Sequence, residues 1–163
     1  MPLDQMFASI AGRYRRVSAG LAVGFGEGPV VGRLRDLCGG QWFCADGGEL
    51  PYDDTQFDVV AMEASCVTRA GVREAYRVLK REGSLFFTVM ERTGNEQEGF
   101  TAPEIYKVVR EGFDIIELRR PPWWKFGRNG RTLTVCARKK AWREHRGLFS
   151  DGSLPFTPFR SRT

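Results

Sequence analysis

Histidine, closely spaced cysteines and long apolar runs are scarce or missing in this sequence. His145 is the only histidine among 163 residues and lies in a charged stretch without a nearby nucleophile, so a serine or cysteine hydrolase triad is not expected. No apolar run reaches the roughly 18 residues that a membrane helix needs, and the N-terminus lacks the pattern of a signal peptide. We therefore expect a cytoplasmic protein without a membrane span.

The cysteines are also too far apart for a metal or redox motif, in which the separation is typically two to four residues. We expect core thiols and no metal site from Cys38, Cys44, Cys66 and Cys136.

The chain carries a net positive charge, but its basic residues are not concentrated in one segment. The net charge is +5, and the 25 lysines and arginines are scattered along the chain. Residues 140–163 form a basic tail after the last predicted strand. A solvated basic face explains this distribution, and nucleic acid is not favoured as a partner. The length and the 42% hydrophobic content indicate one domain with one core.

The most informative segment is an apolar strand, residues 21–23, followed by Gly24, Gly26 and Gly28. Alternating glycines let a ligand lie against bare backbone. Pro29 then suits the first turn of a helix that ends at residues 39–40. A strand, a glycine loop and a helix are typical of a parallel α/β unit.

Periodicity predicts the remaining elements. Thr101 and Glu104 form a capping box at the start of one helix, and residues 91–99 are a polar loop. The predicted helices include residues 3–17 and a helix whose apolar face spans 72–79 and which closes at residue 83. The predicted strands cover residues 41–45, 57–62, 84–90, 113–119 and 131–137, and the last two form an antiparallel hairpin at a sheet edge.

Four segments in order resemble class I S-adenosylmethionine-dependent methyltransferases, closest to the ubiquinone and menaquinone biosynthesis type (type 11). Residues 7–14 are similar to that family's entry helix, and residues 23–28 to its glycine motif. Residues 46–60 contain Leu-Pro-Tyr-Asp-Asp, which is similar to the family's Leu-Pro-Phe-x-Asp, and residues 75–85 contain Tyr-Arg-Val-Leu-Lys, which resembles the family's Tyr-Arg-Val-Leu-Lys-Pro-Gly-Gly stretch. A dinucleotide-binding unit fits less well, because it needs Gly-x-Gly-x-x-Gly and Pro29 stands at its last glycine.

The resemblance implies an α/β, Rossmann-like class I methyltransferase fold, with a mostly parallel sheet and a C-terminal antiparallel edge hairpin. The domain would span residues 1–139, with residues 1–18 as a lid helix. The sequence between the glycines and residue 50 has room for only one strand. We therefore expect a fold that is one strand-helix unit shorter than usual.

Two departures from the family concern the cofactor. Ala22 stands where the family has an acidic residue that holds the amino acid part of the cofactor. If the family's second strand and its helix are deleted, Asp46 is the adenine-side residue; otherwise Asp46 is the acid that holds the ribose. The distance from Asp46 to the Leu-Pro-Tyr-Asp-Asp segment favours the first alternative. Binding of S-adenosylmethionine could be weakened or lost, although Glu27 and Glu63 are carboxylates that could replace the missing ones.

The resemblance identifies no catalytic residue, but it implies a set of cofactor-binding residues: Tyr14, Gly24, Gly26, Gly28, Asp46, Gly47 and Glu63. Tyr14 would close over the cofactor, and Glu63 would line the transfer site. The methyl acceptor, a small molecule, would lie near Trp123, Trp124, Tyr106 and the loop at residues 91–100.

Plainer interpretations stay open for each of these features. The glycines could serve only a tight turn, Asp46 could only end its strand, Tyr14 could be a core residue, and the tryptophans could be edge packing. The alternative function is accordingly a degenerate, non-catalytic domain that serves as a binding or assembly module. A homodimer could bury the surface left by the missing unit.

Overall fold

Parallel strands build most of the sheet in this computed structural model, which describes residues 3–92, 94–95, 97–121 and 131–141. Its six strands run across the sheet in the order β2 (Gln41–Ala45), β1 (Ala19–Val23), β3 (Phe57–Met62), β4 (Leu79–Glu91), β6 (Arg131–Lys139) and β5 (Phe113–Arg119). The first four strands are mutually parallel, and β6 is antiparallel to both β4 and β5. The predicted mostly parallel sheet with an antiparallel edge pair is confirmed.

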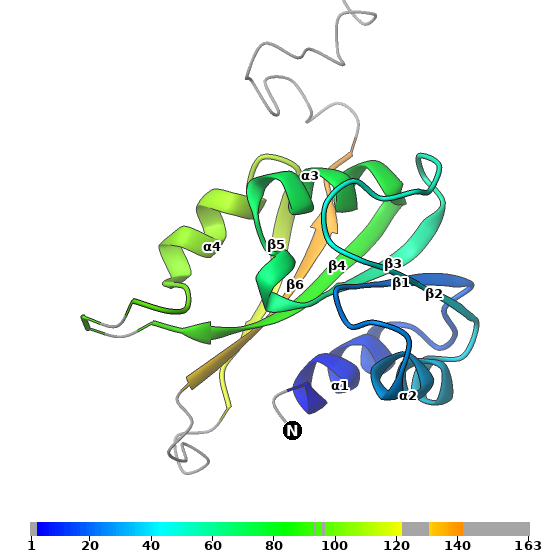
Figure 1. Ribbon diagram of the computed structural model, residues 1–163, viewed down its shortest axis with the longest axis horizontal. Helices are drawn as coiled ribbons and strands as arrows, with labels where there is room; N and C mark the ends of the chain where they lie inside the picture. The colour runs from blue at the N-terminus through cyan, green and yellow to red at the C-terminus, as the bar shows by residue number, and fades with distance from the viewer. Residues whose placement is uncertain (1–2, 93, 96, 122–130, 142–163) are drawn as a thin grey trace, which may run out of the picture.

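Helices cover both faces of this sheet (Figure 1). On one face, α1 (Asp4–Arg13) and α2 (Pro29–Cys38) bury apolar side chains against the sheet, among them Ile10, Leu34 and Phe86. On the other face, α3 (Arg69–Val78) and α4 (Ala102–Val109) cover a second core that includes Phe57 and Phe87. None of the described helices is long and apolar enough to cross a membrane.

The helix termini follow the sequence signals. Thr101 and Glu104 form the predicted capping box at the start of α4. At α2, Pro29 occupies the first turn and Gly39, with φ 66°, follows the last residue. The short 3-10 helix η1 (Ala64–Cys66), which the sequence did not predict, follows β3 directly.

Two element boundaries differ from the prediction. Helix α1 ends at Arg13, four residues early, because Tyr14 adopts an extended conformation with φ −121° and ψ 119°. At the other boundary, β4 already begins at Leu79, where the sequence predicts helix up to Gly83. Glu82, with φ 62°, lies in a register shift between β3 and β4 that leaves the residues between Leu79 and Ser84 without partners in the ladder.

Strand β2 is the edge of the parallel part of the sheet. It follows α2 along the chain and, within the described residues, pairs only with β1. Among the residues that the structure describes, one flank of β2 therefore has no neighbouring strand. The expected domain boundary at residue 139 stays a prediction, because residues 142–163 lie outside the described part.

Candidate functional site

The carboxyl ends of β1, β2 and β3 meet at one edge of the sheet, and backbone hydrogen bonds hold them together there. The N–H of Gly24 donates to Ala45 O at 2.8 Å, and the N–H of Glu63 donates to Val23 O at 2.9 Å. Ligands of open α/β sheets bind at this edge. The structure therefore brings Gly24, Asp46 and Glu63 together, each directly after the end of its strand.

The glycine loop at residues 24–28 is an open backbone surface. Gly24 and Gly26 have φ values of 87° and 71°, which favour glycine. A Cβ on Gly24 would lie 2.7 Å from Cys66 Sγ. At Gly26 and Gly28, by contrast, a Cβ would meet no heavy atom within 4 Å. The second half of the loop thus has free space above it that a ligand could fill.

Carboxylates flank this space. Glu63 is half-buried, and its carboxylate caps η1 by accepting a hydrogen bond from Ser65 N at 2.9 Å; it also accepts one from Ser65 Oγ. Asp46 and Glu27 are exposed. Carboxylates in this position attract cations and accept hydrogen bonds from ligand hydroxyl groups.

Cys66 belongs to this site, although sequence reasoning assigned all four cysteines to the core. Its thiol lies between the glycine loop and the turn after β2, because a Cβ on Gly24 or on Gly47 would approach Cys66 Sγ to 2.7 or 2.9 Å. Cys38 and Cys136 are buried, whereas Cys44 and Cys66 are only half-buried. No sequence pattern marks Cys66 as different from the core thiols, because its position depends on η1.

Thiol alkylation should separate these two classes. We expect iodoacetamide at about pH 8 to label Cys44 and Cys66 more than about tenfold faster than Cys38 and Cys136, because the thiolate is the reactive form. Burial raises the pKa of Cys136 to about 12. Peptide mass spectrometry over time measures the four rates. Equal labelling of Cys136 and Cys66 would contradict this arrangement of the core.

Tyr14 is not brought to the carboxyl edge in this structure. Its hydroxyl donates to Ser84 Oγ at 2.9 Å, and its ring packs edge-on against Phe86. Ser84 pairs with Val59, which pairs in turn with Gly20, four residues before Gly24. Closure of Tyr14 over a cofactor stays a prediction, and it would require α1 to move.

Ala22 offers no group to a ligand at this edge. Its side chain is fully buried, at 0% exposure, in the core beneath α1 and α2. The structure also places β2 directly beside β1, so that Ala45 pairs with Val23 and Asp46 follows the end of that pair. The roles of Asp46 and Gly47 toward a cofactor stay predictions.

The predicted acceptor region is only partly described. Trp123 and Trp124 lie outside the described residues. Tyr106 is on α4 with half of its surface exposed. Glu91, which the sequence assigned to the 91–100 loop, is the last residue of β4, and it forms an ion pair with Arg120 at 2.9 Å that holds the pKa of its carboxyl below the usual range.

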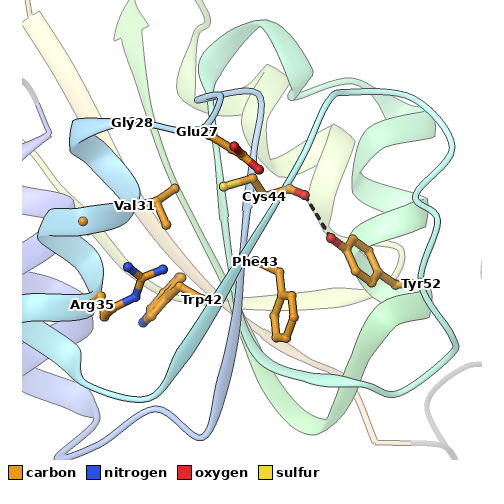
Figure 2. A pocket seen from close by; sticks show the side chains of 9 residues that line it. Glu27, Gly28, Val31, Arg35, Trp42, Phe43, Cys44 and Tyr52 are labelled. Carbon is orange, nitrogen blue, oxygen red and sulfur yellow. Dashed lines mark hydrogen bonds between the residues drawn. The ribbon is translucent and has the colours of Figure 1, made fainter.

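A pocket of about 420 Å³ runs from the glycine loop down the flank of β2 (Figure 2). Tyr52 borders it, and its hydroxyl donates to Cys44 O at 2.9 Å. The pocket is lined by Glu27, Gly28, Val31, Gly32, Arg35, Trp42, Phe43, Cys44 and Tyr52. Sequence reasoning did not foresee it.

Comparison with known proteins shows what part of this chain is similar to. Residues 30–87 match a family model described as a methyltransferase domain, type 11. A comparison with curated protein sequences finds no match.

Solved structures agree over most of the chain. The 1,6-didemethyltoxoflavin-N1-methyltransferase of Burkholderia thailandensis, with bound 1,6-didemethyltoxoflavin and S-adenosylhomocysteine, is 18% identical with a TM-score of 0.67 over 86% of this chain and 79% of its own. The N-methyltransferase NodS of Bradyrhizobium japonicum, in complex with S-adenosylhomocysteine, is 14% identical with a TM-score of 0.64 over 84% and 85%. The [4+2]-cyclase SpnF is 19% identical with a TM-score of 0.64 over 85% and 81%. The chain therefore has the Rossmann-like fold of class I S-adenosylmethionine-dependent methyltransferases in a shortened form, and it resembles their type 11 family.

Proposed function

We propose that this protein is an S-adenosylmethionine-dependent methyltransferase that acts on a small molecule. The observation that carries the proposal is the open glycine loop at residues 24–28, bordered by carboxylates at the carboxyl edge of the sheet. The family match supports it from the adjoining segment, because that match begins at residue 30, directly after the loop.

The residues present fit the cofactor, provided that Glu63 replaces the acid that is missing at Ala22. The free space over Gly26 and Gly28 allows a ligand to contact backbone. Asp46 and Gly47 would hold the nucleoside, and Glu63 would attract the positively charged methionine part. Since Ala22 is buried and apolar, Glu63 takes over the electrostatic role of the missing acid.

S-adenosylmethionine supplies a methyl group on a sulfonium, which is transferred by in-line displacement. The protein must then align donor and acceptor and exclude water, and it needs no dedicated acid or base. The glycine loop and the turn after β2 would fix the donor through backbone contacts. Cys66, which packs against both segments, would keep them at a constant separation.

Replacement of Glu63 by glutamine tests the electrostatic role. We expect Glu63→Gln to weaken binding of S-adenosylmethionine by about tenfold more than binding of S-adenosylhomocysteine, because only the former carries the sulfonium charge, and an interaction with a charged group is worth roughly 1.5–3 kcal/mol. Isothermal titration calorimetry with both ligands gives the ratio.

Glu49→Gln is the matched control, since Glu49 is exposed on the turn after β2 and the substitution removes the same charge. It should leave the ratio unchanged. An equal loss of both ligands in Glu63→Gln would refute a role for its charge and would point to loss of the η1 cap instead.

The second candidate function is a non-catalytic binding module, and the buried Ala22 is the observation that favours it. A structural neighbour named as a cyclase shows that reactions other than methyl transfer occur on this fold. Titration of the unmodified protein decides between the two candidates. Absence of binding at about 1 mM of either ligand, an affinity weaker than roughly −4 kcal/mol, would remove the methyltransferase proposal.

A further inference from the structure

The outer edge of β2 presents backbone groups that β1 does not use. Gln41 N donates to Ser18 O and Ala45 O accepts from Gly24 N, so these two residues face β1. Successive residues of a strand alternate in direction. The N–H and C=O groups of Trp42 and Cys44 therefore point away from the sheet, along the pocket of Figure 2.

The opposite edge of the sheet carries a bulge and a charged side chain that hinder pairing, whereas among the described residues the outer edge of β2 has neither and is met only at Cys44 O by the Tyr52 hydroxyl. Strand β5 contains a register shift between Ile115 and Glu117, and the Glu117 side chain forms an ion pair with Arg13 at 2.7 Å. Bulges and charges of this kind prevent edge-to-edge association. Strand β2 is regular and reads Gln-Trp-Phe-Cys-Ala, with Phe43 37% exposed.

The charged residues beside β2 are complementary to those of a second copy that is related to the first by a two-fold axis. Glu27 and Arg35 are exposed on the α2 side of the pocket, Glu27 near Cys44 and Arg35 near Trp42 (Figure 2). Neither forms an ion pair with another of the described residues. A two-fold axis through Phe43 reverses the strand direction, so it brings Glu27 of each copy to Arg35 of the other.

We propose that two copies of this chain associate through their β2 edges, antiparallel, with the two-fold axis at Phe43. Trp42 of one copy then lies opposite Cys44 of the other, and each such pair exchanges two backbone hydrogen bonds. The Cys44 carbonyl has a second lone pair for this bond besides the one that receives the Tyr52 hydroxyl. The two Phe43 side chains face each other in the pair that is not hydrogen-bonded, and two ion pairs flank the strands.

Cross-linking tests the position of the axis. In an antiparallel pair that is not hydrogen-bonded, opposite Cβ atoms lie about 4.5–5.5 Å apart, close enough for a disulfide after small adjustments. In a chain with Cys44→Ser and Cys66→Ser, Phe43→Cys should form a disulfide-linked dimer under mild oxidation. Ile116→Cys in the same background is the matched control, because Ile116 is similarly exposed, at 40%, on the opposite edge strand. It should stay monomeric on a non-reducing gel.

Charge reversal provides a second test that leaves the core intact. Glu27→Arg and Arg35→Glu should each weaken the dimer by about tenfold or more in sedimentation velocity, because each single change creates two like-charge pairs. The double variant should return to within about threefold of the original dissociation constant, since it restores both pairs. A chain that stays monomeric at about 100 µM, cross-linking through Ile116→Cys alone, or a double variant no better than the singles would overturn the proposal.

Discussion

Replacing Gly28 with asparagine is expected to lower the affinity for S-adenosylhomocysteine by about 100-fold without loss of stability. The free space over Gly28 would be filled by the new side chain, which a bound ligand could not displace at low cost. The backbone can accept the change, because Gly28 has an extended φ of 175° and caps α2 without a side-chain hydrogen bond. Asparagine is among the best N-cap residues, so the free energy of unfolding should stay the same or rise by about 0.5 kcal/mol.

Two measurements make this test decisive, calorimetric titration of the ligand and thermal unfolding of the variant. Gly12→Ala on α1, where a Cβ also meets nothing within 4 Å, is the control and should leave the affinity unchanged. Gly24→Ala cannot replace Gly28→Asn, because its Cβ would collide with Cys66 and cost stability as well as binding. Unchanged affinity in Gly28→Asn would show that the ligand does not lie over this loop.

The glycine loop could be foreseen because its signal is local. Positive φ at Gly24 and Gly26 and a helix that starts at Pro29 are set by residues that are neighbours in the sequence. The mostly parallel sheet with its antiparallel edge pair could be foreseen in the same way, since alternating strands and helices leave few arrangements, whereas the order of the strands in the sheet was not predicted.

Tyr14 and Cys66 could not be placed from the sequence because their partners lie far along the chain. Tyr14 has the helical spacing of a core residue, but its hydroxyl bonds to Ser84, 70 positions later. Cys66 lies beside Gly24 and Gly47 only because η1 turns directly after β3. The pocket beside β2 was likewise unpredictable, since it arises from strands and a helix that meet only in the folded chain.

Arg77 belongs to a sequence motif that was recognised without an explanation of what its arginine does in the fold. The residue lies in the Tyr-Arg-Val-Leu-Lys segment, and its guanidinium extends from α3 to the turn between β2 and β3. It donates to Leu50 O at 2.8 Å and to Tyr52 O at 2.7 Å, and it pairs with Asp54 at 2.8 Å and Glu74 at 3.0 Å. Glu74 in turn accepts from Leu50 N at 2.8 Å, so the turn is tied to α3 from both sides.

This network predicts how stability depends on pH. The hydrogen bond from Arg77, with a smaller contribution from Leu50 N, lowers the pKa of Glu74 below its usual 4.5. A lowered carboxyl pKa means stability that is present above the unfolded pKa and is lost as the pH falls through the folded pKa. The contribution of the pair should therefore be full above about pH 5 and should decline below about pH 4.5.

Arg77→Met should lower the free energy of unfolding by about 2–3 kcal/mol at neutral pH, because it leaves the carbonyls of the buried Leu50 and the half-buried Tyr52, and the Glu74 carboxylate, without their shared donor. For a chain of this length the melting temperature should fall by roughly 5–10 °C. Arg69→Met on the same helix is the control, and it should cost less than about 0.5 kcal/mol, because its ion pair with Glu111 is exposed.

Urea unfolding at several pH values measures both variants. The deficit of Arg77→Met should shrink below about pH 4.5, where the unmodified protein loses the same interaction. A deficit that is constant with pH would assign the loss to the packing of the Arg77 stem, and a deficit as small as that of Arg69→Met would show that the turn is held by other contacts.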